Sequence, residues 1–198
     1  MENRKVRKSM DFSFNFKRCN KGFTLIELII SLGLVGIIMS IVIFFLTSNI
    51  LMFKNNDRDI ELQQQGQFIL GFLEDKIIQS TKIIYLQDRN GLIKHNTNDK
   101  VNLNKIILES KIETEKGYIF QLSKDLGYNY YNLKYGKGLN GTATIEVGNY
   151  IEKIEVEPIP LESKYLEAKG LSLSILLNFG GKQKTYTTQL IFRNYDRR

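Results

Sequence analysis

The chain has 198 residues with an ordinary hydrophobic content of 42%, which fits a protein with a single membrane span rather than a polytopic one. Seven of its 28 basic residues but only two of its 21 acidic residues lie in residues 1–22, so the formal charge is +5 in this tail and +2 in all that follows. A remainder so close to neutral argues against nucleic acid as a direct ligand. The single cysteine, Cys19, also lies in the tail, so the rest of the chain uses no disulfide.

Residues 23–53 form an apolar run of 31 residues in which Glu27 is the only charged side chain. About 20 apolar residues suffice for a helix to cross the hydrocarbon of a bilayer, so the run predicts one transmembrane helix. The basic tail predicts a cytoplasmic N-terminus and an extracytoplasmic C-terminal domain, in the plasma (inner) membrane. An ordinary secretory signal has an apolar core of about 7–15 residues and a small-residue cleavage site, which this segment does not match.

The octapeptide at 21–28, Lys-Gly-Phe-Thr-Leu-Ile-Glu-Leu, resembles the processing site of type IV prepilins and pseudopilins. The resemblance implies that a prepilin peptidase cuts after Gly22, removes residues 1–22 as a leader and methylates the new N-terminal amine of Phe23. Glu27 matches the glutamate that the family carries at its fifth mature position. The mature helix is then expected to join a filament by packing against the helices of other pilin subunits.

The chemistry of these residues agrees with the resemblance. Gly22 has no Cβ, so the backbone around it is open to a protease at the membrane surface. Cleavage creates a cation four residues before Glu27, and in a helical assembly this carboxylate would pair with the amine of a neighbouring subunit and fix the axial register. The alternative is that the Glu27 side chain merely extends to the membrane interface.

Small residues follow Glu27 at spacings of three and four, at Gly33, Gly36 and Ser40. Small side chains on one face let helices approach closely in lipid, so Gly33 and Gly36 are candidate helix-packing residues. Glycine is also common in membrane helices in general, and this alternative stays open. Many major pilins carry a proline in mid-helix, whereas the run here has none, and Phe44 occupies the nearby position.

Residues 54–82 predict an amphipathic continuation of the same helix. Apolar residues recur at three- and four-residue spacing, although two glycines, Gly66 and Gly71, each weaken the prediction by about 1 kcal/mol relative to alanine. The apolar face is expected to consist of Phe68, Ile69, Phe72, Leu73 and Ile77.

After residue 82 the pattern alternates with period two, which predicts strands. Strands are expected at 82–87, 104–109, 118–122, 128–135, 142–147 and 151–157, the last one ended by Pro158 and Pro160, with a turn at 88–91, an exposed loop at 94–100 and a Gly-rich loop at 136–141. The clearest signal is a hairpin with Leu171 to Phe179 on one arm, Gly180-Gly181 at the turn and Tyr186 to Phe192 on the other. The predicted fold class is α+β, with a long N-terminal transmembrane and amphipathic helix packed on an antiparallel sheet of a β-rich domain at 83–198.

No catalytic or metal-binding constellation stands out in the sequence. His95 is a lone histidine in a polar loop, the acidic stretch 56–61 lacks the glycine turn of a calcium loop, and 136–138 lacks the spacing of a phosphate loop. The chain is therefore expected to be no enzyme and to use no cofactor or metal. Four tyrosines, Tyr128, Tyr130, Tyr131 and Tyr135, either form a stacking surface for single-stranded DNA or sugar or simply pack within strands.

Together these features predict a minor type IV pilin or pseudopilin, a structural subunit of a pilus, a type II secretion pseudopilus or a DNA-uptake pseudopilus. Its mature length and β-rich tail look most like J-type pseudopilins and W-type minor pilins. The alternative is a membrane-anchored extracytoplasmic binding module, or a tip adhesin, that uses the helix only as a tether.

Overall fold

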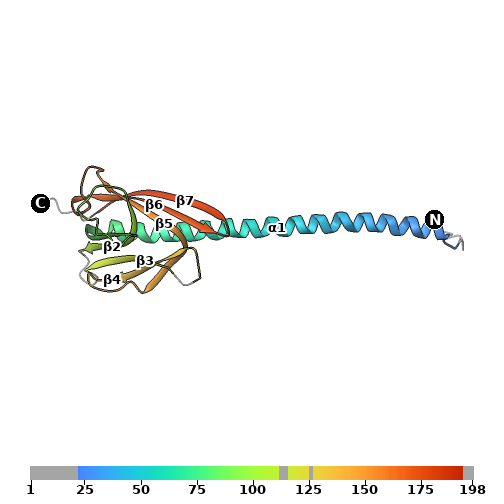
Figure 1. Cartoon of the computed structure of the whole chain (residues 1–198), viewed down its shortest axis with the longest axis horizontal. Helices are drawn as coiled ribbons and strands as arrows, with labels where there is room; N and C mark the ends of the chain where they lie inside the picture. Colours follow the sequence, from blue (N-terminus) through green and yellow to red (C-terminus); the bar gives the residue numbers. More distant parts are fainter. Residues whose placement is uncertain (1–21, 112–115, 125–126, 194–198) are drawn as a thin grey trace, which may run out of the picture. The chain divides into compact units, whose positions relative to one another are not determined.

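The computed structural model describes residues 22–111, 116–124 and 127–193 (Figure 1). The predicted leader therefore lies outside the described residues, except for Gly22. The chain divides into two compact units, with the division between Ile50 and Leu51, inside the helix α1 (Leu25–Ile78). The helix is followed by an antiparallel sheet, which confirms the predicted α+β class.

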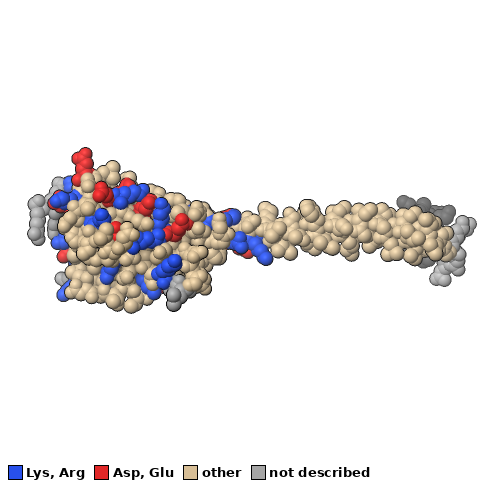
Figure 2. Space-filling view, viewed as in Figure 1, with Lys and Arg blue, Asp and Glu red and all other residues tan. Residues whose placement is uncertain are grey.

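The part of α1 that belongs to the first unit has an apolar surface. Its large hydrophobic side chains are all exposed, and Figure 2 shows that this stretch of helix carries no visible Lys, Arg, Asp or Glu. Among the described residues, α1 is the one helix long and apolar enough to cross a membrane. Because exposed apolar surface of this extent is costly in water, the segment needs lipid or other helices around it.

The second unit contains the rest of α1, which is amphipathic as predicted. Its buried residues are spaced three or four apart along one face, namely Leu62, Gly66, Ile69, Leu73 and Ile77. Phe68 was expected on this face but is 60% exposed and stacks on Phe72 with ring centroids 6.4 Å apart. It lies one position off the buried stripe, because a helix turns by about 100° per residue.

The helix ends at Ile78, four residues before the predicted end at 82. Ser80 already pairs with Ser110 of the neighbouring strand, so the chain turns directly from the helix into the sheet. The β-branched residues Thr81, Ile83 and Ile84 favour the strand, and their pairing outweighs the helical periodicity at this boundary.

The sheet has seven antiparallel strands in sequence order. They are β1 (Ser80–Asp88), β2 (Val101–Ser110), β3 (Gly117–Lys124), β4 (Tyr131–Lys137), β5 (Ile145–Ile159), β6 (Gly170–Phe179) and β7 (Lys182–Ile191). β2 pairs with β3 over residues 105–109 and with β5 at residues 101–102. Because β3 pairs with β4 and β4 pairs with β5, the strands β2 to β5 close into a ring. Figure 1 shows α1 with β6 and β7 on one side and β3 and β4 on the other.

The predicted hairpins are confirmed. β6 and β7 pair continuously from Gly170–Ile191 to Phe179–Lys182, with Gly180 and Gly181 at positive φ in the turn. β3 and β4 also pair, although β4 begins at Tyr131 rather than at residue 128 and includes Gly136 and Lys137, which were expected in a loop. Residues 125–126 of this hairpin's turn lie outside the described residues.

One strand, β5, replaces the two that the sequence predicts at 142–147 and 151–157. It runs without interruption through Gly148 and continues past Pro158, which pairs with Leu171. A Cβ on Gly148 would lie 2.3 Å from the Cγ1 of Ile69, so this glycine allows close helix–strand packing rather than a turn. The strand is irregular rather than broken, because Tyr150 has a φ of 63° and the β5–β6 register shifts between Ile151 and Lys153.

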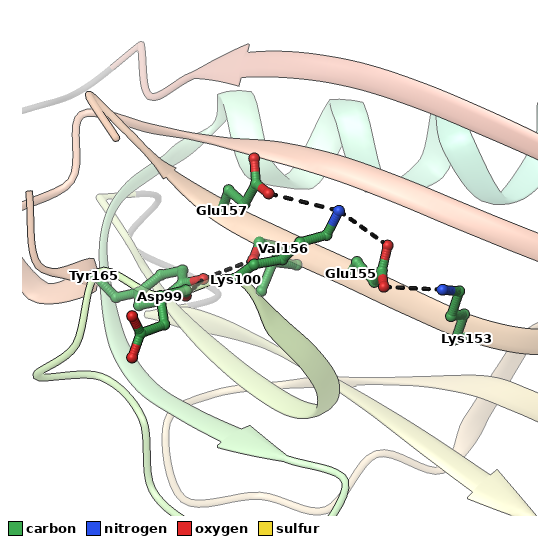
Figure 3. Close-up of polar contacts among 7 residues, drawn as sticks. All are labelled: Asp99, Lys100, Lys153, Glu155, Val156, Glu157 and Tyr165. Carbon is green, nitrogen blue, oxygen red and sulfur yellow. Dashed lines mark hydrogen bonds and ion pairs between the residues drawn. The ribbon is translucent and has the colours of Figure 1, made fainter. Parts of the chain in front are cut away.

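The hydrophobic core of the second unit lies between the buried face of α1 and the inward side chains of the sheet. Tyr165, in the short 3-10 helix η1 (Tyr165–Glu167), is fully buried there. Its hydroxyl lies 2.6 Å from the carbonyl oxygen of Val156 and 2.9 Å from that of Asp99 (Figure 3). The Tyr165 ring therefore fastens η1 and the loop before β2 to the middle of the sheet.

Candidate processing and assembly site

The predicted processing bond lies in irregular backbone just before α1. Gly22, Phe23 and Thr24 precede the first helical residue and are exposed, with Phe23 81% accessible. No described atom lies within 4 Å of the position that a Cβ on Gly22 would occupy. Within the described residues, Gly22 therefore has open space around the position of its missing side chain.

Thr24 and Glu27 form a capping box at the start of α1. The backbone N–H and the hydroxyl of Thr24 each donate to Oε2 of Glu27 at 2.9 Å, and the N–H of Glu27 donates to Oγ1 of Thr24 at 3.4 Å. Such a box satisfies N–H groups that the first helical turn leaves without partners. The sequence analysis did not identify this contact, although the spacing Thr-x-x-Glu before an apolar run is its usual signature.

The capping box uses only one oxygen of the Glu27 carboxylate. Both Thr24 donors end on Oε2, and no described residue donates to Oε1. A carboxylate accepts several hydrogen bonds, so Glu27 is able to cap its own helix and receive a cation from another molecule at the same time.

The predicted packing residues Gly33 and Gly36 are open. Apart from the neighbouring backbone of the helix itself, no described atom lies within 4 Å of a Cβ built on either residue, so both positions are open on the surface of α1. Ser40 follows Gly36 by four residues, and its hydroxyl donates to the carbonyl of Gly36 at 2.8 Å. Thr47 and Asn49 bond back to the helix in the same way, at 2.9 Å each. Polar side chains satisfied within their own helix are compatible with an apolar surrounding.

Several charged groups of the second unit form ion pairs with one another. Lys100 lies 3.1 Å from a Glu155 carboxylate oxygen and 3.6 Å from one of Glu157, and Lys153 donates to Glu155 at 2.9 Å (Figure 3). The hydrogen bond from Lys153 holds the pKa of Glu155 below its usual value, against the effect of partial burial, and Lys100 adds to the lowering. Within the described residues, no three His, Cys, Asp or Glu side chains come together as metal ligands.

The acidic stretch 56–61 lies on α1 and is no calcium loop, and Asp59 forms an ion pair with Lys182 of β7. His95 packs its ring 6.4 Å from that of Tyr85, and its carbonyl oxygen accepts the N–H of Leu166. Asp59 and His95 therefore each make contacts with other residues of the same domain.

The four tyrosines singled out in the sequence have different surroundings. Tyr135 is buried in the core against Phe72, and Tyr131 lies under the guanidinium of Arg89, 3.8 Å from its ring centroid. Tyr128 and Tyr130 instead form an aromatic row with two residues that the sequence analysis did not single out. The row consists of Tyr128, Tyr130, Tyr150 and Phe179, with successive ring centroids 4.9, 5.0 and 4.2 Å apart.

Comparison with known protein families finds a prokaryotic N-terminal methylation motif at residues 17–43. No curated protein and no solved structure matches the chain. The motif covers Gly22, Phe23, Glu27, Gly33 and Gly36, and it supports a type IV pilin-like or pseudopilin-like precursor. The nearer resemblance to J-type pseudopilins or W-type minor pilins stays a prediction.

Proposed function

We propose that this chain is a minor type IV pilin or pseudopilin, a structural subunit and not an enzyme. A prepilin peptidase cuts between Gly22 and Phe23 and methylates the amine of Phe23. The mature protein then sits in the plasma (inner) membrane through one span, with its C-terminal domain outside, until it enters or primes a filament. The carrying observation is that the methylation motif at 17–43 coincides with the start of a helix whose apolar side chains are exposed.

The geometry at the start of α1 supports a direct role for Glu27 in assembly. Cleavage leaves the new amine one residue before Thr24, whose own N–H and hydroxyl already donate to Oε2 of Glu27. Oε1 is left for the amine of a neighbouring subunit. In the apolar interior of a filament, an ion pair of this kind fixes the axial position of one helix against the next, because a charge left unpaired there is costly.

The processing site is tested with Gly22→Ala, in the full chain expressed together with a prepilin peptidase. The added methyl group is expected to block cleavage, so mass spectrometry should find a protein that still carries residues 1–22. Gly33→Ala is the matched control, because it makes the same change outside the cleavage site and should be processed normally. Recovery of Gly22→Ala protein that begins at a methylated Phe23 would refute the proposed site.

The assembly mechanism is tested with two substitutions of Glu27. Glu27→Gln keeps an oxygen that accepts the Thr24 donors and so preserves the cap, but it removes the charge, whereas Glu27→Ala removes both. We expect both variants to be cleaved normally and to enter sheared filaments about tenfold less than the wild type, or less still. Thr24→Ala, which removes only the hydroxyl of the cap, should assemble nearly as well as the wild type.

Normal incorporation of Glu27→Gln would show that the charge is not needed and would restrict Glu27 to its capping role. Normal incorporation of Glu27→Ala as well would refute any role of Glu27 in assembly. Absence of the wild type itself from sheared filaments would favour the tether alternative, in which the helix anchors a binding module or adhesin and plays no part in filament packing.

A further inference from the structure

The aromatic row lies on one edge of the second unit. This edge also contains the first residues of α1 that belong to the second unit, at 51–61. The turn between β6 and β7 sits on the helix at residues 55–59. Arg58 donates to the carbonyl of Gly180 at 3.3 Å, and Lys182 donates to the carbonyl of Asn55 at 3.3 Å. Lys54, Asp57, Arg58 and Glu61 line a shallow hollow of about 420 Å³ together with Tyr150 and Phe179 of the row.

This edge comes directly after the end of the apolar run. Residues 51–53 are apolar and exposed, and Lys54 is the first charged residue after Glu27. At 1.5 Å per helical residue, Lys54 lies about 1.5 Å and Arg58 about 7.5 Å beyond Phe53. The interfacial layer on each side of a bilayer is roughly 5–8 Å thick. If the hydrocarbon ends near Phe53, Lys54 and Arg58 therefore both lie within this layer. The run is also longer than the ~20 residues needed to cross, so burial of its last residues draws this edge toward the membrane.

The side chains on this edge are the kinds that a membrane–water interface favours. Tyr128 is 53% exposed, and the other members of the row are half-buried. Three of the four rings are tyrosines, which place an apolar ring and a polar hydroxyl on opposite sides of an interface. Lys54 and Arg58 stand beside them as cations suited to lipid phosphates, while the carboxylates of Asp57 and Glu61 line the same hollow. The rings also contact one another, which uses ring surface that a sugar or a base would need for stacking.

We propose that the aromatic row, together with Lys54 and Arg58, is a membrane-contacting rim that rests among the lipid headgroups of the outer leaflet before the subunit enters a filament. This inference rests on the proposed membrane span of residues 23–53.

The test uses the absence of tryptophan from the natural chain, which makes any introduced tryptophan the only one. Three single-tryptophan variants of the full chain are reconstituted into vesicles of phosphatidylethanolamine and phosphatidylglycerol that contain lipids brominated near the top of the acyl chain. Phe44→Trp reports on the span, Tyr128→Trp on the rim and Leu161→Trp on a matched distant site. Leu161 is 64% exposed and lies just after Ile159, which pairs with Gly170 at the other end of β6 from Phe179, on the order of 30 Å away.

We expect bromine to quench the fluorescence of Phe44→Trp strongly and that of Tyr128→Trp at least about twofold more than that of Leu161→Trp. Tyr130→Trp should rank with Tyr128→Trp, which guards against a local disturbance by either substitution. If Phe44→Trp is quenched while Tyr128→Trp and Leu161→Trp are equally unaffected, the rim is refuted and the span stands. If Phe44→Trp itself is unquenched, the proposed membrane span fails. A change in Tyr128→Trp emission on adding oligosaccharide, with no response to the bilayer, would identify a sugar site and overturn the rim.

Discussion

Gly66 and Gly71 offer the same substitution in one helix with opposite expected signs. A Cβ on Gly66 would lie 2.1 Å from Cε2 and 2.3 Å from Cζ of Tyr186, well inside van der Waals contact. The tyrosine is also held in place, because its hydroxyl donates to the carbonyl of Leu62 at 3.1 Å. Gly71 is exposed, and no described atom outside its own helix lies within 4 Å of a Cβ built on it.

The expected magnitudes follow from three terms. Replacing glycine by alanine inside a helix stabilises it by about 1 kcal/mol. At Gly66 this gain is outweighed by overpacking, which costs about 1–3 kcal/mol, and by loss of the Tyr186 hydrogen bond, which costs about 0.5–1.5 kcal/mol. Gly66→Ala should therefore lower the free energy of unfolding by about 1–3 kcal/mol, whereas Gly71→Ala should raise it by about 1 kcal/mol.

Thermal unfolding of the full chain in detergent, followed by near-ultraviolet circular dichroism of the tyrosines, measures both effects. At about 2–4 °C per kcal/mol, Gly66→Ala should lower Tm by roughly 2–12 °C and Gly71→Ala should raise it by roughly 2–4 °C. In a Tyr186→Ala background the penalty of Gly66→Ala should disappear, because the obstructing ring is gone. The close-approach explanation would be refuted if Gly66→Ala had the same Tm as the wild type. It would also be refuted if Gly66→Ala lowered Tm equally in the wild-type and Tyr186→Ala backgrounds.

Two further predictions concern the polar contacts in Figure 3. Tyr165→Phe should destabilise the domain by about 1–3 kcal/mol, because the carbonyls of Val156 and Asp99 lose a buried donor, and an unchanged Tm would contradict this. Lys153→Met should raise the pKa of Glu155 as read from carboxyl NMR shifts across a pH titration. The pKa of Glu155 is lowered in the folded state, so its stabilising effect is present above the ordinary carboxyl pKa and is lost as the pH falls through the folded value. The Tm difference between Lys153→Met and the wild type should therefore shrink in acid, and a difference independent of pH would exclude this origin.

The sequence alone determined the features that depend on local pattern. The apolar run and its single carboxylate predict an exposed membrane-type helix, because the length and composition of one segment decide whether it can cross a bilayer. The octapeptide at 21–28 lies inside the methylation motif at 17–43, so this local pattern already indicated the family resemblance. The β6–β7 hairpin was equally predictable, because alternating apolar residues around a Gly-Gly turn fix both the strands and their register. The capping box of Thr24 and Glu27 was readable from its spacing and was overlooked.

The tertiary structure decided what depends on residues far apart in the chain. Gly66 and Gly148 appear in the sequence as a weak helix position and a strand break, yet each is a site where a distant side chain, Tyr186 or Ile69, packs against the backbone. β5 runs on through Gly148 because this glycine lets the Ile69 side chain pack against the strand instead of forming a turn. The aromatic row joins Tyr128 and Tyr130, which precede β4, to Tyr150 of β5 and Phe179 of β6. A glycine, proline or aromatic residue is compatible with several structural roles. Which role it takes depends on the distant residues that pack against it in the folded protein.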